Sequence, residues 1–244
     1  MLKIRASLIS LFLLGCTPKD QIKESQKLSY NICYSYTQGK CSSGTGFYLS
    51  YKEKTYLVSA LHVFSGVNPN TNQPIIQNYP LPSQIRTSNL ENGDPHFEYW
   101  PLKDAYGNIK YIKPDTTSIF YDLALLEVDL ETQKNVLDWN DNWLTYSPKI
   151  NEQVFYFGYP VINDNIPKIP RLFRGKITSL PSKDTSLITT DMNSFQGCSG
   201  SPVFTLQGNN IVLIGIVMGT FDDDNKNALI VPLPLVWGKI QVRK

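Results

Sequence analysis

Short runs rich in Val, Ile, Phe and Tyr recur along most of this chain, and clusters of Gly, Pro, Asn and Asp separate them. Runs of this length and composition favour β-strands, and no comparably long stretch has the 3.6-residue apolar period of an amphipathic helix. The expected strands are residues 28–36, 46–51, 54–60, 117–129, 153–158, 173–179, 186–190, 202–206 and 211–218. Many short strands between turns predict an all-β protein built as a barrel or sandwich.

Two stretches interrupt this pattern. Residues 65–115 are rich in Pro and Asn, and we expect loops with a few strands among them. Residues 131–148 form a polar connector that divides the chain into two halves, 29–130 and 149–244, each with its own strands. Residues 233–242 could form a short closing helix.

The N-terminus predicts export. Two cations lie within residues 1–5, and the apolar run that follows, residues 6–14, is shorter than the roughly 20 residues that a membrane-spanning helix needs. Residues 1–15 therefore have the pattern of a secretory signal peptide. The sequence Leu13-Leu14-Gly15-Cys16 resembles the bacterial lipobox, in which the cysteine is diacylated and becomes the new N-terminus.

The resemblance implies that Cys16 anchors the chain to a bacterial membrane, on its periplasmic or cell-surface face. The alternative is an ordinary secretory signal with an incidental cysteine. Residues 16–28 are polar, and we expect a flexible tether there.

The charge balance argues against nucleic-acid binding. Of 23 basic residues, two, Lys3 and Arg5, lie in the segment expected to be removed, which leaves 21 basic against 21 acidic residues. Proteins that bind nucleic acids through the phosphate backbone need a surplus of Lys and Arg on one face. We therefore expect no nucleic-acid partner.

Cys33 and Cys41 would lie in an oxidising compartment, where disulfides form. They flank a turn-like sequence, and a hairpin centred on Thr37 would place them opposite each other on one face. We expect a disulfide between them, and the alternative is two buried thiols.

Three polar residues are candidates for a chemical role. His62 follows an expected strand, Asp122 lies inside an apolar run, and Ser199 lies in Gly197-Cys198-Ser199-Gly200. A lone buried carboxylate is costly and needs a partner, and glycines beside a serine leave backbone N–H groups uncovered. Taken singly, each has a plainer explanation, such as a packed histidine or a tight loop. The other histidine, His96, lies in a turn-like sequence.

Together these residues resemble the trypsin-like serine peptidases of the chymotrypsin fold. The matching segments, in the order of that family, are Gly44-Thr45-Gly46-Phe47, Ser59-Ala60-Leu61-His62, Asp122-Leu123-Ala124-Leu125-Leu126, Gly197-Cys198-Ser199-Gly200-Ser201-Pro202-Val203 and Gly215-Ile216-Val217. The order His, Asp, Ser differs from that of subtilisins and α/β-hydrolases. The ending Ser199-Gly200-Ser201-Pro202-Val203 is similar to the bacterial branch that includes glutamyl endopeptidases.

The resemblance implies two six-stranded antiparallel β-barrels with an active site in the cleft between them. His62 and Asp122 would come from the first barrel and Ser199 from the second. In the family mechanism the serine attacks the scissile carbonyl, the histidine transfers the proton, and the aspartate orients the imidazole. Backbone N–H groups of Gly197 and Ser199 would form the oxyanion hole, and no metal or organic cofactor is needed.

The chain also departs from the family. Cys198 stands where the animal digestive enzymes have the aspartate that pairs with a freed N-terminus, so that activation switch should be absent. We expect Cys198 to be a small buried residue, with a redox-sensitive thiol or a cysteine nucleophile as alternatives.

The resemblance also places a specificity pocket. Its floor would be Asn193 and Ser194, neither of them acidic, which argues against a preference for Arg or Lys. The glutamyl branch has a histidine where Val217 stands, so a preference for glutamate is not indicated. The pocket wall would be Met218, Gly219 and Thr220. The run Asp222-Asp223-Asp224 is either a solvated loop or a site for basic side chains or Ca²⁺.

We therefore expect a membrane-anchored, monomeric serine endopeptidase that acts on polypeptides. The alternative from another functional class is a catalytically inactive peptidase-fold lipoprotein that binds proteins or peptides. An esterase would share the chemistry, but the sequence lacks the signals of the fold expected for one.

Overall fold

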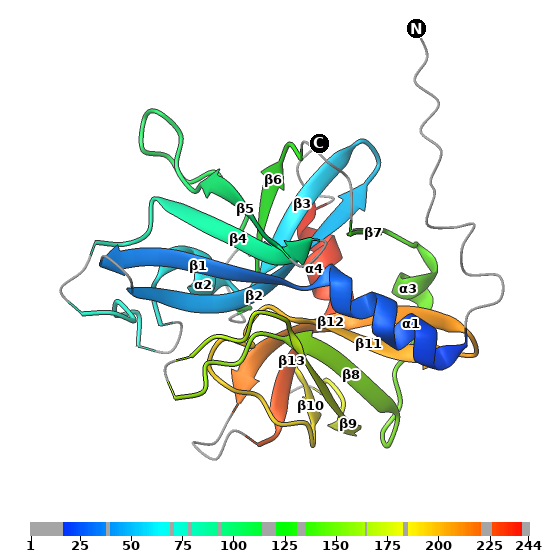
Figure 1. Ribbon diagram of the computed structural model, residues 1–244. Coiled ribbons are helices and arrows are strands. Elements are labelled where there is room, and N and C mark those ends of the chain that lie inside the picture. The colour runs from blue at the N-terminus through cyan, green and yellow to red at the C-terminus, as the bar shows by residue number, and fades with distance from the viewer. Residues whose placement is uncertain are drawn as a thin grey trace, which may run out of the picture.

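The structure, a computed structural model, describes residues 17–37, 40–68, 71–77, 80–91, 94–113, 121–130, 135–163, 165–182, 185–220 and 226–240. Its strands form two groups, one above the other in Figure 1. The strands are β1 (Tyr30–Thr37), β2 (Lys40–Tyr51), β3 (Lys54–Ser59), β4 (Gln84–Glu91), β5 (Asp94–Pro101), β6 (Ala124–Val128), β7 (Val136–Asp138), β8 (Gln153–Gly158), β9 (Arg171–Ser179), β10 (Ile188–Thr190), β11 (Pro202–Gln207), β12 (Asn210–Thr220) and β13 (Ala228–Pro232). The helices are α1 (Pro18–Ser25), the 3₁₀ turn η1 (Gln26–Leu28), α2 (Leu61–Ser65), α3 (Asn142–Thr145) and α4 (Leu233–Ile240).

The first group is a curled sheet in the order β5-β4-β1-β2-β3-β6, and the short strand β7 pairs with β2. Its main-path pairs are antiparallel, whereas β7 runs parallel to β2. In the part of the chain that the structure describes, this sheet stays open between β5 and β6. It is a half-barrel of seven strands rather than a closed barrel of six.

The second group is a closed barrel in the order β10-β13-β12-β11-β8-β9. Two of its strands are among the most buried of the chain: every residue of β13 is buried, and so are five of the six residues of β8. The predicted fold class, all-β with two chymotrypsin-like barrels, is confirmed, with the first barrel open as described above.

Apolar contacts join the two sheets into one core. The cluster around the closed barrel also contains residues of the first sheet, among them Phe47, Val58 and Leu125. A second cluster, with Ile32 and Leu57, fills the other side of the first sheet. Burial of such side chains supplies the main favourable free energy of folding. The two sheets are therefore held face to face, with the ends of their strands and the loops between them meeting at the seam.

Strands with two apolar sides were the easiest to find from the sequence, and β8 coincides with the predicted segment 153–158. The hairpin β4–β5 lay inside the segment 65–115 for which no individual strand was predicted. Most of β5 is exposed, and it includes His96, which we expected in a turn. A strand at the edge of a sheet needs few apolar residues, so its sequence gives little signal.

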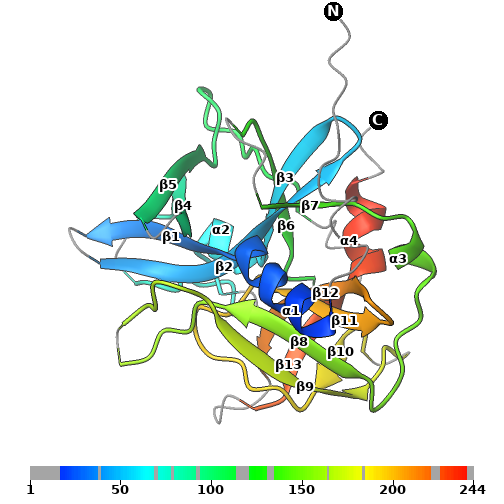
Figure 2. The same cartoon turned by 45° about the vertical axis from the view of Figure 1, so that its right-hand side comes forward.

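The segment expected to be a flexible tether has a regular structure. Thr17 caps helix α1 in a capping box with Asp20, and Gln21 and Ser25 are buried. The Ser29 hydroxyl donates to the carbonyl oxygen of Phe157 on β8, at 2.9 Å. The helix lies across the strands of the second barrel in both ribbon views (Figures 1 and 2). The segment therefore packs on the protein rather than extending away from it.

The predicted disulfide is absent from the structure. In the β1–β2 hairpin Cys33 pairs with Ser43, and Cys41 pairs with Ser35, so the two cysteines are offset rather than opposite. Diagonal positions on paired strands are about 7–8 Å apart, too far for a disulfide, whose Cβ atoms are about 4 Å apart. Among the described residues, Cys33 is buried and forms no disulfide. The hairpin turns one residue later than we assumed, which shifts the register.

Cys16 and residues 1–15, the predicted lipidation site and signal peptide, lie outside the described residues. Within the described ranges, no helix combines the length and apolar character required to cross a membrane.

Candidate active site

Strand β3 brings His62 to the seam between the two sheets. The strand ends at Ser59, Ala60 stays extended, and the chain then turns into the single-turn helix α2, of which His62 is the second residue. Gly66 ends this helix with a φ of 68°, a left-handed conformation that glycine adopts without steric cost. The His62 side chain is 20% exposed, so its ring can contact solvent or a ligand.

Asp122 lies beside His62 because β6 pairs with β3. Ala124 pairs with Ser59 in this antiparallel ladder, which sets Asp122 alongside the start of α2. The Asp122 side chain is 1% exposed. Its Oδ1 accepts a hydrogen bond from the main-chain N–H of His62 at 2.8 Å, and its Oδ2 is bonded to ring atom Nδ1 of the same residue.

These two bonds explain how the Asp122 carboxylate can be buried although it lies within an apolar run of the sequence. A buried carboxylate needs hydrogen-bond donors to replace water, and one residue supplies both. With Nδ1–H donating to the carboxylate, the lone pair on Nε2 points away from Asp122 and can accept a proton.

Ser199 lies in the loop between β10 and β11, residues 191–201. Gly197 and Gly200, on either side of it, have φ values of 89° and 88°. A Cβ atom on Gly197 would lie 2.3 Å from the carbonyl oxygen of Tyr159, and one on Gly200 would lie 2.1 Å from that of Thr45. Both positions therefore require glycine for their backbone conformation and for space.

Thr45 on β2 fastens this loop to the first sheet. Its hydroxyl donates to the carbonyl oxygen of Gly197 at 2.7 Å and accepts from the N–H of Tyr159 at 3.0 Å. Its own N–H donates to the carbonyl oxygen of Ser199 at 2.8 Å. All three bonds join the first sheet to residues of the second half of the chain.

The same docking places Ser199 next to the segment that carries His62. A Cβ atom on Gly200 would lie 2.2 Å from the Ser59 hydroxyl and 2.9 Å from the main-chain nitrogen of Ala60, two residues before His62. Ser199 itself is partly exposed. Among the described residues the Ser199 hydroxyl forms no hydrogen bond with His62. The structure thus joins His62 to Asp122 directly and brings the Ser199 main chain to the same seam.

The N–H groups around Ser199 divide into two sets. Those of Cys198, Gly200 and Ser201 donate to the carbonyl oxygens of Phe195, Val217 and Cys198, at 2.9, 2.7 and 3.1 Å. Those of Gly197 and Ser199 have no acceptor among the described residues. These are the two groups that the family resemblance predicts for an oxyanion hole.

The predicted pocket residues lie in two neighbouring segments, the loop that follows Met192 and the end of β12. Ala228 donates its N–H to the carbonyl oxygen of Met192 at 2.9 Å and pairs with Thr220 across β12 and β13. This connects the floor residues that follow Met192 to the end of β12. Asn193 is exposed and Ser194 is buried, while Met218, Gly219 and Thr220 are half-buried.

Cys198 is fully buried, as predicted. Burial raises the pKa of its thiol to about 11, so the thiol stays protonated at neutral pH. A nucleophilic cysteine requires the opposite, a lowered pKa and access to solvent. The environment of Cys198 therefore favours a packing role.

A cavity of about 580 Å³ lies beside the His62–Asp122 pair. Apolar residues make up part of its wall, including Leu61, Leu81 and Tyr111, and Lys113 lies at its edge. Side chains of a bound ligand could enter it next to the imidazole.

In the part of the chain that the structure describes, no group of three or more His, Cys, Asp or Glu side chains is arranged to hold a metal ion. The run Asp222-Asp223-Asp224 lies outside the described residues.

Sequence reasoning missed the roles of Thr45 and Tyr156. Thr45 lies in a segment that carried the family resemblance, but a threonine between glycines gives no sign of bonds to residues more than a hundred positions away. Tyr156 lies in a strand of apolar and aromatic residues and was taken only as part of that strand. Its hydroxyl donates to the carbonyl oxygen of Asn193 at 2.5 Å.

A family described as "Trypsin-like peptidase domain" matches residues 44–216, which is most of the chain and includes His62, Asp122 and Ser199. No functionally curated protein matches the sequence.

Several solved structures are similar to this chain in fold. A serine endoprotease from Yersinia pestis shares 19% identity with a TM-score of 0.61, over 93% of this chain and 66% of that one. The HtrA-type protease AlgW, solved with a tripeptide, shares 17% with a TM-score of 0.60, over 93% and 63%. The MamO protease domain from Magnetospirillum magneticum shares 18% with a TM-score of 0.56, over 89% and 97%. The chain spans about two thirds of the length of the first two structures.

Proposed function

This chain belongs to the family of trypsin-like peptidase domains, which are serine peptidases, and we propose that it cleaves polypeptides as an endopeptidase with Ser199 as nucleophile. The observation that carries the proposal is the bonding of buried Asp122 to both the main chain and the ring of His62. This arrangement fixes the tautomer that a general base beside a serine needs.

The reaction follows from these positions. His62 Nε2 accepts the proton of the Ser199 hydroxyl as Oγ attacks the scissile carbonyl carbon, and then gives that proton to the leaving amine. Asp122 keeps Nδ1 protonated and stabilises the positive imidazolium. Water then enters, loses a proton to the same nitrogen, and releases the acyl group from Ser199. The missing hydrogen bond between Ser199 and His62 is compatible with this, since such bonds often tighten only when substrate is bound.

The unbonded N–H groups of Gly197 and Ser199 supply the second element of the mechanism. Negative charge develops on the carbonyl oxygen of the substrate in the transition state, and donors aimed at that position stabilise it by about 3 kcal/mol each. The neighbouring N–H groups are already engaged by protein carbonyls, which leaves this pair for the substrate.

The substrate is proposed to be an extended polypeptide chain whose side chain enters the region of Asn193, Ser194, Met218, Gly219 and Thr220. A β-bulge between Val217 and Gly219 leaves Met218 out of register with β13. The pocket residues carry no charge, so neither a basic nor an acidic side chain is favoured there. This argues against the strict glutamate preference of the glutamyl endopeptidases, although the sequence around Ser199 is similar to theirs.

A fluorophosphonate probe tests the proposal. It reacts with activated serines, so it should label the wild-type protein once, on the peptide that contains Ser199. Ser199→Ala should remove the label, whereas Ser147→Ala, a change at an exposed serine of the connector, should keep it. A folded wild-type protein that takes no label would contradict the proposal.

An inactive binding module is the second candidate, and the missing bond between Ser199 and His62 is the observation that favours it. The same probe decides between the two, because a peptide-binding protein without an activated serine stays unlabelled even when it binds the peptide.

The lipid anchor on Cys16 is part of the proposal. Helix α1 begins at Pro18 and packs on the second barrel, so a diacyl group on Cys16 would hold the catalytic domain close to a bacterial membrane, on its periplasmic or cell-surface face. Intact-mass measurement of the mature protein should find the lipid on Cys16. An unmodified N-terminus at another residue would reject the anchor and leave the proposed peptidase activity in place.

A further inference from the structure

Tyr156 on β8 reaches into the loop that carries Ser199. The residue is fully buried, and its hydroxyl donates to the carbonyl oxygen of Asn193 on the predicted pocket floor. Burial, with a smaller contribution from Cys198, raises the pKa of Tyr156 well above its ordinary value. The hydroxyl is therefore a permanent donor at neutral pH.

Two other side chains of the loop, the thiol of Cys198 and the hydroxyl of Ser194, lie close enough to influence the pKa of Tyr156. Ser194 belongs to the predicted pocket floor, and Cys198 directly precedes the proposed nucleophile. The Tyr156 hydroxyl is thus hydrogen-bonded to the loop at Asn193, before the segment 195–197.

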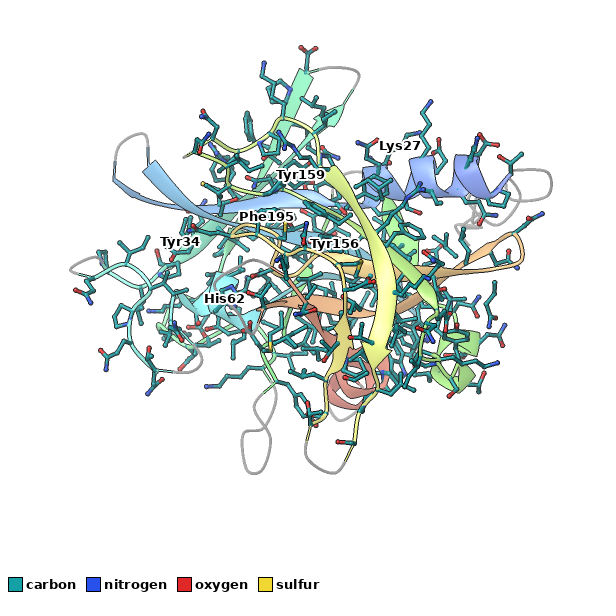
Figure 3. The ribbon with its side chains drawn as sticks, turned by 90° about the horizontal axis from the view of Figure 1, so that it is seen from below. Lys27, Tyr34, His62, Tyr156, Tyr159 and Phe195 are labelled. Atoms are coloured by element: carbon teal, nitrogen blue, oxygen red, sulfur yellow. The ribbon has the colours of Figure 1, made fainter. Side chains whose placement is uncertain are left out.

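The ring of Tyr156 supports this loop as well. It stacks on Phe173 of β9, with ring centroids 4.7 Å apart, and Phe173 lies against Phe195 at 5.8 Å. The carbonyl oxygen of Phe195 accepts the N–H of Cys198 at 2.9 Å. Figure 3 shows Tyr156 and Phe195 near the centre of the molecule, with His62 to their left.

Strand β8 leaves space for this contact at Gly158. A Cβ atom there would lie 2.7 Å from the Ser201 hydroxyl and 3.1 Å from the Cys198 sulfur. The loop can therefore lie closely against the end of β8, with Tyr156 beneath it.

This loop needs such a support. Gly197 and Gly200 lack side chains and have wide conformational freedom, yet the N–H groups of Gly197 and Ser199 must keep one direction to hold an oxyanion. In the animal enzymes a charged aspartate at the position of Cys198 pairs with a freed N-terminus. Here the partners are neutral and buried, and their contact forms when the chain folds, without cleavage of the chain.

We propose that Tyr156 is a positioning residue, which holds the loop of residues 193–198 through its hydroxyl so that the N–H groups of Gly197 and Ser199 point at the substrate. This inference rests on the proposed function. It assigns the support of this loop to a neutral, buried tyrosine that is hydrogen-bonded to the Asn193 carbonyl oxygen.

The test compares Tyr156→Phe with Tyr159→Phe. Both changes remove only a buried hydroxyl, but that of Tyr159 donates to the carbonyl oxygen of Ser29, away from the loop. We expect Tyr156→Phe to lower the second-order rate constant of fluorophosphonate labelling, and kcat for a peptide substrate, about tenfold or more, since small misplacements of reacting groups cost up to about 100-fold. KM should change less than kcat. Tyr159→Phe should stay within about twofold of wild type in both measurements.

Thermal melting of both variants separates positioning from general loss of stability. If the two variants melt together and only Tyr156→Phe loses labelling rate, the hydroxyl of Tyr156 acts on the site. Should Tyr156→Phe fail to fold, Cys198→Ala tests the packing of the same loop against β8, because the buried thiol lies beside Gly158, and we expect it to slow labelling at least about threefold.

A Tyr156→Phe protein that is folded and is labelled at the wild-type rate would overturn the inference and leave the proposed function standing. A Cys198→Ala rate equal to wild type would do the same where Tyr156→Phe does not fold. A wild-type protein that takes no label would overturn the proposed function, and the inference with it.

Discussion

Asp122 accepts two hydrogen bonds from a single residue, one from the main chain and one from the ring of His62. The main-chain bond fixes the carboxylate against the start of α2, and the other oxygen then fixes the ring. The orientation of the imidazole therefore follows from the folded backbone and does not depend on a flexible side chain.

Asp122→Asn tests this arrangement. The amide group would face Nδ1 with a donor instead of an acceptor, which forces the proton of the imidazole onto Nε2, the atom that must accept the proton of Ser199. We expect kcat to fall by on the order of 10⁴-fold, the effect of the same change in a well-studied serine peptidase. Peptide hydrolysis measures it, and circular dichroism shows whether the fold is kept. A loss of tenfold or less in a folded variant would contradict the assigned role.

Single residues differ in how well the sequence reveals them. His62, Asp122 and Ser199 could be singled out because their segments, taken together and in order, resemble a known family, although each alone has a plainer explanation. Tyr156 could not, since its role depends on a loop about 40 residues further along the chain, and nothing in the strand itself indicates that contact. The disulfide failed for a related reason, because the hairpin register depends on a single residue at the turn.

Strands and helices also differ in how readily the sequence predicts them. Strands β8 and β12 of the second barrel were predicted because they are buried and rich in β-branched and aromatic residues. Strand β13, although fully buried, was not predicted, since its five residues give too short a pattern. Helix α1 was missed because its residues are mostly polar and its burial is confined to Gln21 and Ser25. The hairpin β4–β5 was missed because β5 is a mostly exposed edge strand, on which an apolar pattern is weak.

Strand β2 is joined to the second half of the chain by the hydrogen bonds of Thr45, and mutation can test their contribution. Thr45 joins it to Gly197, Ser199 and Tyr159. Thr45→Val keeps the shape but removes the hydroxyl, which leaves the buried carbonyl oxygen of Gly197 and the N–H of Tyr159 without their partner. Each unsatisfied buried group costs about 1–3 kcal/mol, so for two groups we expect a loss of about 2–6 kcal/mol in the free energy of unfolding, and slower labelling of Ser199.

Thr45→Ser is the matched control, because it keeps the hydroxyl and removes only a methyl group. Its free energy of unfolding should stay within about 1 kcal/mol of wild type. Urea denaturation measures both variants. If valine and serine had equal effects, the hydrogen bonds of Thr45 would not be what holds the loop to the first sheet.

At the scale of the whole molecule, the residues of the proposed triad come from both sheets. The first provides His62 and Asp122, and the second provides Ser199 with its glycines. The sheets share an apolar core, and the bonds of Thr45 cross the seam. The family resemblance predicted this division, whereas the open first sheet and the docking of α1 depend on long-range packing that local patterns do not report.

The most direct test of the account is to trap the covalent intermediate. The protein would be mixed with an activated ester substrate, quenched in acid within the first turnover, and examined by intact mass and peptide mapping. The account predicts one acyl group on the peptide that contains Ser199 in the wild type, and none in Ser199→Ala or His62→Ala. A wild-type protein that hydrolyses the ester without acylation of Ser199, or that remains unacylated altogether, would contradict it.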